Sequence, residues 1–321
     1  MANPTFPDLE QFYEGLKWIG QRVSYKKDLT LDGVARHLPA FDRESFGENE
    51  YLDAIIRKPF GKDDRHIPVA SVSKRYALIQ HHEFLGWLKD GVKRVGLKPE
   101  SLPTELWMTD YGERIRLRFK ASPKTFDPGD GFPMVLSAEC FNSVDRSCAL
   151  EIRMTWLRLV CTNGLTVQEK SSLRKVHDVV WMNRDDPAEF LSDQLARADQ
   201  QFKTFRDWVA HPVALNRIEA WADEHVAKTW GIEVASRICH IARTGYDGPV
   251  ERPPEKISPH LRIVKSEMEV PGAARPAKNL FDVAQALSWV ASRRESIEDQ
   301  TDWVRTIPVL ISQLTNGTKS S

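Results

Sequence analysis

Residues 114–120 read RIRLRFK, and this stretch indicates the fold class more clearly than any other part of the chain. Cationic and apolar side chains alternate strictly along it, with Arg114, Arg116, Arg118 and Lys120 separated by Ile115, Leu117 and Phe119. Successive side chains of a β-strand point to opposite faces. We therefore expect a strand that carries four cations on one face and buries three apolar residues on the other.

Further strands are predicted on both sides of this stretch. Residues 72–80 are rich in Val, Tyr and Ile and predict a strand, followed by a helix over about 82–95. Residues 110–112 (DYG) predict a hairpin turn just before the cationic strand. Residues 132–141 and 148–160 predict two more strands. The first 70 residues are expected to be partly helical, with Asp8 capping a helix over about 9–23.

The second half of the chain reads as helical. Asp186-Pro187-Ala188-Glu189 is a typical helix start, and apolar residues then recur at steps of four and three up to Val209. More helix is expected over 213–242, and Asn279 is expected to cap a last helical region. Between them, residues 246–276 hold six prolines and predict an extended connector.

This order of elements predicts an α+β protein: a twisted antiparallel sheet in the middle of the chain packed against helices, with a helical C-terminal half. The expected blocks are a partly helical N-terminal segment (1–66), a strand-rich core (67–180), a helical region packed on it (181–244), the connector (245–278) and C-terminal helices (279–321).

The charges balance overall but not locally. Among the 321 residues, 45 Lys and Arg match 45 Asp and Glu, which excludes a uniformly basic nucleic-acid coat and an acidic tail protein. Residues 72–175 hold 17 cationic against 12 acidic residues, so the rest of the chain carries the opposite surplus. Like charges along a strand face repel. The cation row therefore needs either acidic side chains from neighbouring elements or a polyanion such as a nucleic-acid backbone.

Aromatic residues near the cations suit the second alternative, because single-strand binders place phosphates on Lys and Arg and stack bases on rings. Trp107 and Tyr111 are expected to be exposed for stacking, whereas Trp156 shares a face with apolar residues and is expected in the core. The candidate nucleic-acid-binding residues are Lys74, Arg75, Trp107, Tyr111, Arg114, Arg116, Arg118, Lys120, Arg146 and Arg153.

Known catalytic patterns are missing from the sequence. It has no phosphate loop, no dinucleotide fingerprint, no nucleophile elbow and no zinc-ligand spacing, so we expect no enzyme activity, cofactor or metal. The cysteines at 140, 148, 161 and 239 form no C-x-x-C pair and read as reduced core thiols. Two minor alternatives are a Cys161–His177 nucleophile–base pair and a nuclease that uses Asp127, Asp130 and Asp145.

The chain shows no sequence signal for a membrane. No apolar run reaches the roughly 18 residues of a membrane-spanning helix. The N-terminus lacks the basic start and apolar stretch of a signal peptide. A cytoplasmic protein without membrane contact is expected.

Two sequence blocks carry a resemblance to a known family. The first is SVSKRYALIQHHE (71–83), with Ser73, Tyr76 and Gln80. The second is FNSVDRSCALEIRMTWLRLVCTNGL (141–165), with Asn142, Ser143, Asp145, Ser147, Arg158, Val160, Cys161, Asn163 and Leu165. They resemble the phage/plasmid-like protein family, catalogued as domain of unknown function 932. Arg146 stands where that family usually has Gly, which leaves the shape of the turn open. Residues 279–289 match a late helix of the family more weakly.

The resemblance implies mobile genetic elements, a cytoplasmic setting and DNA-processing genes nearby. Phage single-strand annealing proteins share a comparable architecture, which is a likeness of fold alone. Our hypothesis is a non-enzymatic protein of a phage, plasmid or other mobile element that binds single-stranded DNA or RNA, for annealing or recombination, as a homo-oligomer. The alternative is a protein-interaction or counter-defence module that grips its partner with the acidic, Trp-bearing helices of residues 186–242.

Overall fold

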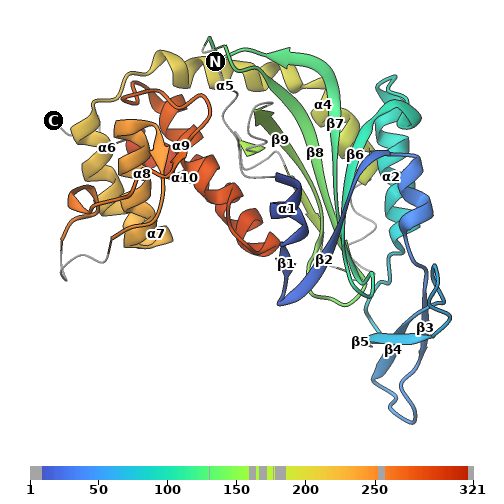
Figure 1. Ribbon diagram of the computed structural model, residues 1–321. Coiled ribbons are helices and arrows are strands. Elements are labelled where there is room, and N and C mark those ends of the chain that lie inside the picture. The colour runs from blue at the N-terminus through green and yellow to red at the C-terminus, as the bar shows by residue number, and fades with distance from the viewer. Residues whose placement is uncertain are drawn as a thin grey trace. The chain divides into compact units, whose positions relative to one another are not determined.

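The computed structural model describes residues 9–129, 131–158, 164–165, 172–175, 177, 186–251 and 257–316 (Figure 1). The chain divides into two units. The first draws on Met1–Pro123, Leu136–Met154 and Lys170–Ala198, and the second on Lys124–Val135, Thr155–Glu169 and Asp199–Ser321. Each unit is therefore assembled from separated stretches, whereas the sequence suggested consecutive blocks.

The main sheet runs in the order β1-β2-β6-β7-β8-β9, with β11 pairing to β9 and β10 pairing to the end of β9. The pairs β1–β2, β2–β6, β6–β7 and β9–β11 are antiparallel. The predicted α+β class with an antiparallel sheet in the middle of the chain is confirmed. The strands are β1 (Lys17–Trp18), β2 (Gln21–Thr30), β6 (Pro103–Thr109), β7 (Arg114–Phe126), β8 (Met134–Ser143), β9 (Leu150–Arg158), β10 (Gly164–Leu165) and β11 (Ser172–Lys175).

The apolar face of β7 is buried as its alternation predicts, since Ile115, Leu117 and Phe119 are fully inaccessible to solvent. Helix α2 (His81–Arg94) forms close to the predicted bounds and buries the residues of its apolar stripe. It packs tightly on α4 (Pro187–Ala196), because a Cβ added at Gly91 would lie 2.9 Å from the carbonyl oxygen of Ala188. The predicted start of α4 is confirmed, since the Asp186 carboxylate accepts a hydrogen bond from the Ala188 amide at 2.8 Å.

Two local predictions in the first unit were wrong. Helix α1 (Leu9–Glu14) ends early, and the chain continues into a hairpin of β1 and β2, whose turn residues Ile19 and Gly20 adopt positive φ (48° and 74°). Strand β5 (Ile67–Ser73) also stops sooner than expected. The chain after it wraps around Arg43, whose guanidinium donates to the carbonyl oxygens of Ser73, Lys74 and Tyr76 at 2.8–3.1 Å. The end of β5 depends on Arg43, which lies 30 residues before Ser73, so a local pattern does not reveal it.

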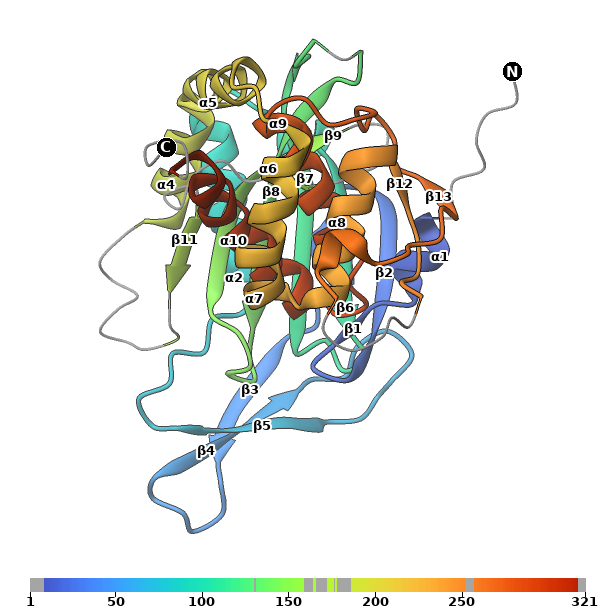
Figure 2. The same ribbon diagram turned by 90° about the vertical axis from the view of Figure 1, so that its left-hand side faces the viewer.

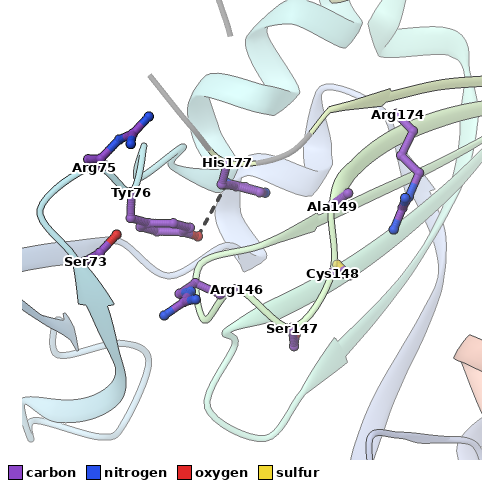
Figure 3. Close-up of a pocket in the computed structure, with 9 residues that line it drawn as sticks. All are labelled: Ser73, Arg75, Tyr76, Arg146, Ser147, Cys148, Ala149, Arg174 and His177. Carbon is purple, nitrogen blue, oxygen red and sulfur yellow. Dashed lines mark hydrogen bonds between the residues drawn. The ribbon is translucent and has the colours of Figure 1, made fainter. Parts of the chain in front are cut away.

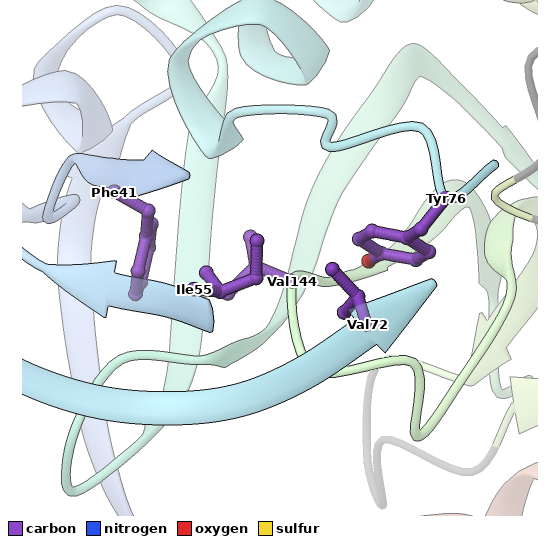
Figure 4. Packing of buried hydrophobic residues seen from close by; sticks show 5 residues of the cluster. All are labelled: Phe41, Ile55, Val72, Tyr76 and Val144. Carbon is purple, nitrogen blue, oxygen red and sulfur yellow. The ribbon is translucent and has the colours of Figure 1, made fainter. Parts of the chain in front are cut away.

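A smaller sheet in the first unit holds one edge of the site described below. Strands β3 (Phe41–Ser45), β4 (Leu52–Arg57) and β5 pair antiparallel in that order. One face of this sheet carries a small buried cluster, which the loop between β8 and β9 completes (Figure 4). The cluster consists of Phe41, Ile55, Val72, Tyr76 and Val144. It fixes the turn after β5 against the β8–β9 loop.

The second unit is mainly helical (Figure 2). The long helix predicted from residue 187 breaks at Arg197 into α4 and α5 (Ala198–Ala210). Helix α9 (Leu280–Ser292) is buried along nearly its whole length, and its cap is confirmed because Asn279 accepts from the Asp282 amide at 2.9 Å. The proline-rich connector contains a short hairpin, β12 (Tyr246–Asp247) with β13 (Met268–Glu269). The other helices are α6 (Leu215–Trp221), α7 (Ala227–Trp230), α8 (Ile232–Thr244), α9 (Leu280–Ser292) and α10 (Ile297–Asn316).

Within the described part of the chain, no helix is both long enough and apolar enough to cross a membrane.

Candidate functional site

The cation row of β7 does not lie on the surface. Arg114, Arg116 and Arg118 are only 4–6% exposed, and each forms an ion pair inside the first unit. Their carboxylate partners are Asp145 at 2.7 Å, Glu139 at 2.6 Å and Glu105 at 2.6 Å, in that order. The expectation that these arginines face a nucleic acid is wrong, because acidic side chains of neighbouring strands and loops occupy their guanidinium groups. Lys120 alone of the row is exposed.

Glu139 lies at the centre of this buried network. It accepts from Arg116 at 2.6 Å and from Arg153 at 2.5 Å, so Arg153 is likewise unavailable to a phosphate. Burial raises the pKa of the Glu139 carboxyl, but the positive charges of the two guanidinium groups outweigh it and hold this pKa well below its usual range. The network is therefore ionised and internally neutralised to a large extent.

The aromatic residues considered for base stacking differ in their exposure to solvent. Trp107 is fully buried opposite Arg116 in the β6–β7 register, with the Arg116 guanidinium carbon 4.6 Å from its ring centroid, so its expected exposure is wrong. Tyr111, in the β6–β7 turn, is 47% exposed. Trp156 is in the core as expected, 1% exposed and in contact with Phe202.

A pocket of about 370 Å³ opens in the first unit, where three segments meet (Figure 3). Three exposed arginines line it: Arg75 from the turn after β5, Arg146 from the β8–β9 loop and Arg174 from β11. None of the lining residues in the described part of the chain is acidic. Arg75 and Arg146 were predicted as binding residues, whereas Arg174 was missed because β11 has no pattern of its own. The other lining residues are Ser73, Tyr76, Ser147, Cys148, Ala149 and His177.

The wall of the pocket contains a buried Tyr–His pair. The rings of Tyr76 and His177 stack with centroids 5.4 Å apart and planes 17° apart. Tyr76 donates its hydroxyl to the Ser143 carbonyl oxygen at 3.2 Å. His177 Nδ1 lies 3.3 Å from the Ala77 carbonyl oxygen and 3.4 Å from the Tyr76 hydroxyl. Burial lowers the pKa of His177, so its ring is neutral at pH 7.

Residues of the two family-like blocks hold this pocket together. Beyond the bond from Tyr76 to Ser143, the Asn142 amide donates to the Ile79 carbonyl oxygen at 3.1 Å. Gln80 binds both main-chain groups of Phe41, accepting at 3.1 Å and donating at 2.7 Å. These side chains thus join segments that are far apart in the sequence, and the pocket opens where the blocks meet.

The turn that presents Arg146 has an unusual backbone. Arg146 has φ of +67°, in the left-handed region that glycine adopts without strain. Asp145 stabilises the turn by accepting from the Ser147 amide at 3.0 Å while pairing with Arg114. A glycine at position 146 would therefore suit the same turn, and this chain places a cation there at a cost in backbone strain.

Other predicted residues do not join the pocket. Lys74 pairs with Asp53, which also accepts from Arg43. Arg158, from the second family-like block, donates to the Gly272 carbonyl oxygen at 3.0 Å in the second unit. Asp130, Cys161 and Asn163 lie outside the described residues.

The minor catalytic and docking alternatives gain no support from the geometry. Asp127 accepts from the Gly129 amide within its own loop. Among the described residues, no group of three or more His, Cys, Asp or Glu side chains could hold a metal ion. Burial raises the pKa of Cys148 to about 12, so this pocket thiol stays protonated. Of the tryptophans on the helices of residues 186–242, which were expected to grip a protein partner, Trp221 and Trp230 are 4% and 8% exposed, and Trp208 is half-buried.

Comparison with known proteins yields one match. No curated protein and no solved structure matches the chain. A family model described as "Domain of unknown function (DUF932)" matches residues 68–237, more than half of the chain. That range includes Tyr76, Arg146, Arg174 and His177, and with them the whole lining of the pocket. The chain therefore belongs to the DUF932 family, as its two sequence blocks predicted.

Proposed function

We propose that this protein is a non-enzymatic, single-stranded nucleic-acid-binding protein whose phosphate contacts lie in the pocket of the first unit. The observation that carries the proposal is the convergence of three exposed arginines, Arg75, Arg146 and Arg174, on one concave site without a lining carboxylate among the described residues. Guanidinium groups bind phosphate oxygens in a bidentate manner and are the usual residues for this task.

The contrast with the β7 row supports this choice of site. The row holds more cations in sequence, but Arg114, Arg116 and Arg118 are buried and bound to carboxylates. A new ligand would have to displace those ion pairs, whereas the pocket already presents its cations to solvent. Arg146 and Arg174 pair with no carboxylate in the parts of the chain that the structure describes.

The size of the pocket favours a single strand over a duplex. About 370 Å³ is the scale of a small ligand, enough for one phosphate with part of its sugar or base. A double helix presents its phosphates on a broad convex surface that cannot enter such a site. Tyr111, half exposed in the β6–β7 turn, offers a ring on which a base of a single strand can stack.

Fluorescence anisotropy with a labelled single-stranded oligonucleotide, titrated at several salt concentrations, tests the proposal. We expect binding at low salt and a drop in the salt slope of about 0.7 when Arg146 or Arg174 is removed. Lys120→Ala is the matched control, because Lys120 is the exposed cation of the β7 row and lies outside the pocket. Absence of binding at low salt refutes the function. Equal losses for Arg146→Gly and Lys120→Ala refute the site.

A further inference from the structure

One residue that lines the pocket has a buried polar atom without a hydrogen-bond partner among the described residues. His177 is 6% exposed, and its Nε2 has no hydrogen-bond partner among the described residues. A buried polar group without a partner is costly, so its persistence at a ligand-sized pocket suggests that a bound molecule completes it. Because His177 lines the pocket together with the three arginines, that molecule is expected to be an anion.

The hydrogen bonds of His177 determine which ring nitrogen carries its proton, and therefore what a bound anion must offer to the other nitrogen. A carbonyl oxygen can only accept, so the contact of Nδ1 with the Ala77 oxygen at 3.3 Å requires the proton on Nδ1. Tyr76 donates its own hydroxyl hydrogen to Ser143, which leaves a hydroxyl lone pair facing the same Nδ1 proton. The neutral ring then presents a bare lone pair at Nε2. An internal phosphodiester holds no proton near neutral pH, so it could contact this acceptor only if the ring itself became protonated, which burial opposes.

We infer that the pocket takes the terminal phosphomonoester of a nucleic-acid strand, with one proton shared between His177 Nε2 and a phosphate oxygen. This inference rests on the proposed function and names its ligand. A phosphomonoester carries a charge of about −1.5 to −2 with a second pKa near 6, so it can hold the shared proton near neutral pH, whereas a diester cannot. Three guanidinium groups also suit its higher charge better than the single charge of a diester.

Binding should therefore be coupled to proton uptake. Above about pH 6 the free monoester is mostly a dianion and free His177 is neutral, so formation of the complex draws one proton from solvent. Among the described groups near His177, burial keeps Tyr76 and Cys148 protonated and lowers the pKa of His81 to about 4. The Asp145 carboxylate is paired with Arg114, and three arginines line the pocket.

The experiment compares a single-stranded oligonucleotide carrying a 5′-phosphate, a 3′-phosphate or hydroxyl ends, by anisotropy between pH 6 and 8. One phosphorylated form should bind about tenfold tighter than the hydroxyl form at pH 6.5. Its dissociation constant should rise by up to tenfold per pH unit above pH 7. His177→Phe keeps an aromatic ring against Tyr76 but lacks Nε2, so it should abolish both the preference and the pH dependence. Thermal melts confirm that the variant is folded.

Equal affinity for phosphorylated and hydroxyl ends at every pH overturns the inference but leaves the proposed function standing. The wild-type pH series decides this point even if His177→Phe fails to fold. Competition by a nucleoside monophosphate as strong as that by the phosphorylated strand keeps the monoester site but overturns nucleic-acid binding as the function. Failure of every oligonucleotide and of the monophosphate to bind refutes both.

Discussion

Glu139→Gln tests the buried charge network of β7 and β8 most directly. Glu139 accepts hydrogen bonds from Arg116 and Arg153 at 2.6 and 2.5 Å, and its side chain is 5% exposed. Each ion pair at about 4 Å between charge centres is worth roughly 4 kcal/mol at an effective dielectric constant of 20, before desolvation is subtracted. Removing one partner of a buried pair leaves an uncompensated charge and typically costs about 3–5 kcal/mol. We expect Glu139→Gln to lower the free energy of unfolding of the first unit by about 4 kcal/mol.

Urea denaturation followed by circular dichroism measures this loss of unfolding free energy. Two further variants show whether it comes from the buried charges. Glu105→Gln is the matched control, because Glu105 also pairs with an arginine of β7 but its side chain is 28% exposed, so its loss should be smaller. Replacing Arg116, Glu139 and Arg153 together by Met removes all three charges and should recover most of the stability. A Glu139→Gln loss below about 1 kcal/mol, or a triple variant less stable than the single one, would refute the reasoning.

The pH dependence of the loss follows from the depressed pKa of Glu139. A carboxyl whose folded pKa is lowered contributes stability above its unfolded pKa, near 4.3, and loses it as pH falls toward the folded value. The difference between wild type and Glu139→Gln should thus be constant above about pH 5 and shrink on acidification. Nucleic-acid affinity of the folded variant should stay at the wild-type level. A tighter affinity would mean that the arginines of β7 reach the ligand after all.

Three further comparisons, between variants or with the wild type, have definite expected outcomes. In α2, Gly91→Ala should destabilise the protein by about 1–3 kcal/mol, because the added methyl group meets Ala188 and Leu191. Gly86→Ala in the same helix has open space around the added methyl group and should stabilise the protein by up to about 1 kcal/mol. The urea midpoints of the two variants measure the difference. Arg146→Gly should be about 1 kcal/mol more stable than Arg146→Ala, since only alanine keeps the left-handed strain, and equal melting temperatures would argue against it. Asp186→Ala should cost about 1 kcal/mol through the lost N-cap of α4, measured by thermal unfolding.

The sequence predicted those parts of the fold whose signals are local. The alternation of residues 114–120, the apolar stripe of α2 and the caps at Asp186 and Asn279 all appear as expected. The errors arose where a distant partner decides the conformation. β2 becomes a strand by pairing with β6, and β5 ends where Arg43 draws three carbonyl groups around itself. Neither helix propensity nor a strand pattern indicates that β2 will pair with β6 or that Arg43 will bind the end of β5.

The site was predicted only in part for a related reason. Alternation correctly placed the arginines of β7 on one face, but it does not reveal that these arginines form ion pairs with Glu105, Glu139 and Asp145. The pocket arginines come one each from three segments, so no single window of sequence groups them. The sequence suggested a role for His177 only as the general base of a pair with Cys161. Its neighbours Tyr76 and Ala77 lie about a hundred residues away, and only the fold brings them together.

The pairing of β2 with β6 limits which fragments of the chain can be expressed in a folded form. The family model begins at residue 68, after β2, yet β2 covers one side of β6 along most of its length. A fragment of residues 68–237 would leave β6 with a row of open amide and carbonyl groups beside buried residues such as Leu106 and Trp107. Such an edge recruits strands from other chains. The stretch that identifies the family is thus shorter than the stretch that must be expressed to obtain the folded protein, and a fragment of residues 68–237 would aggregate before its binding could be measured.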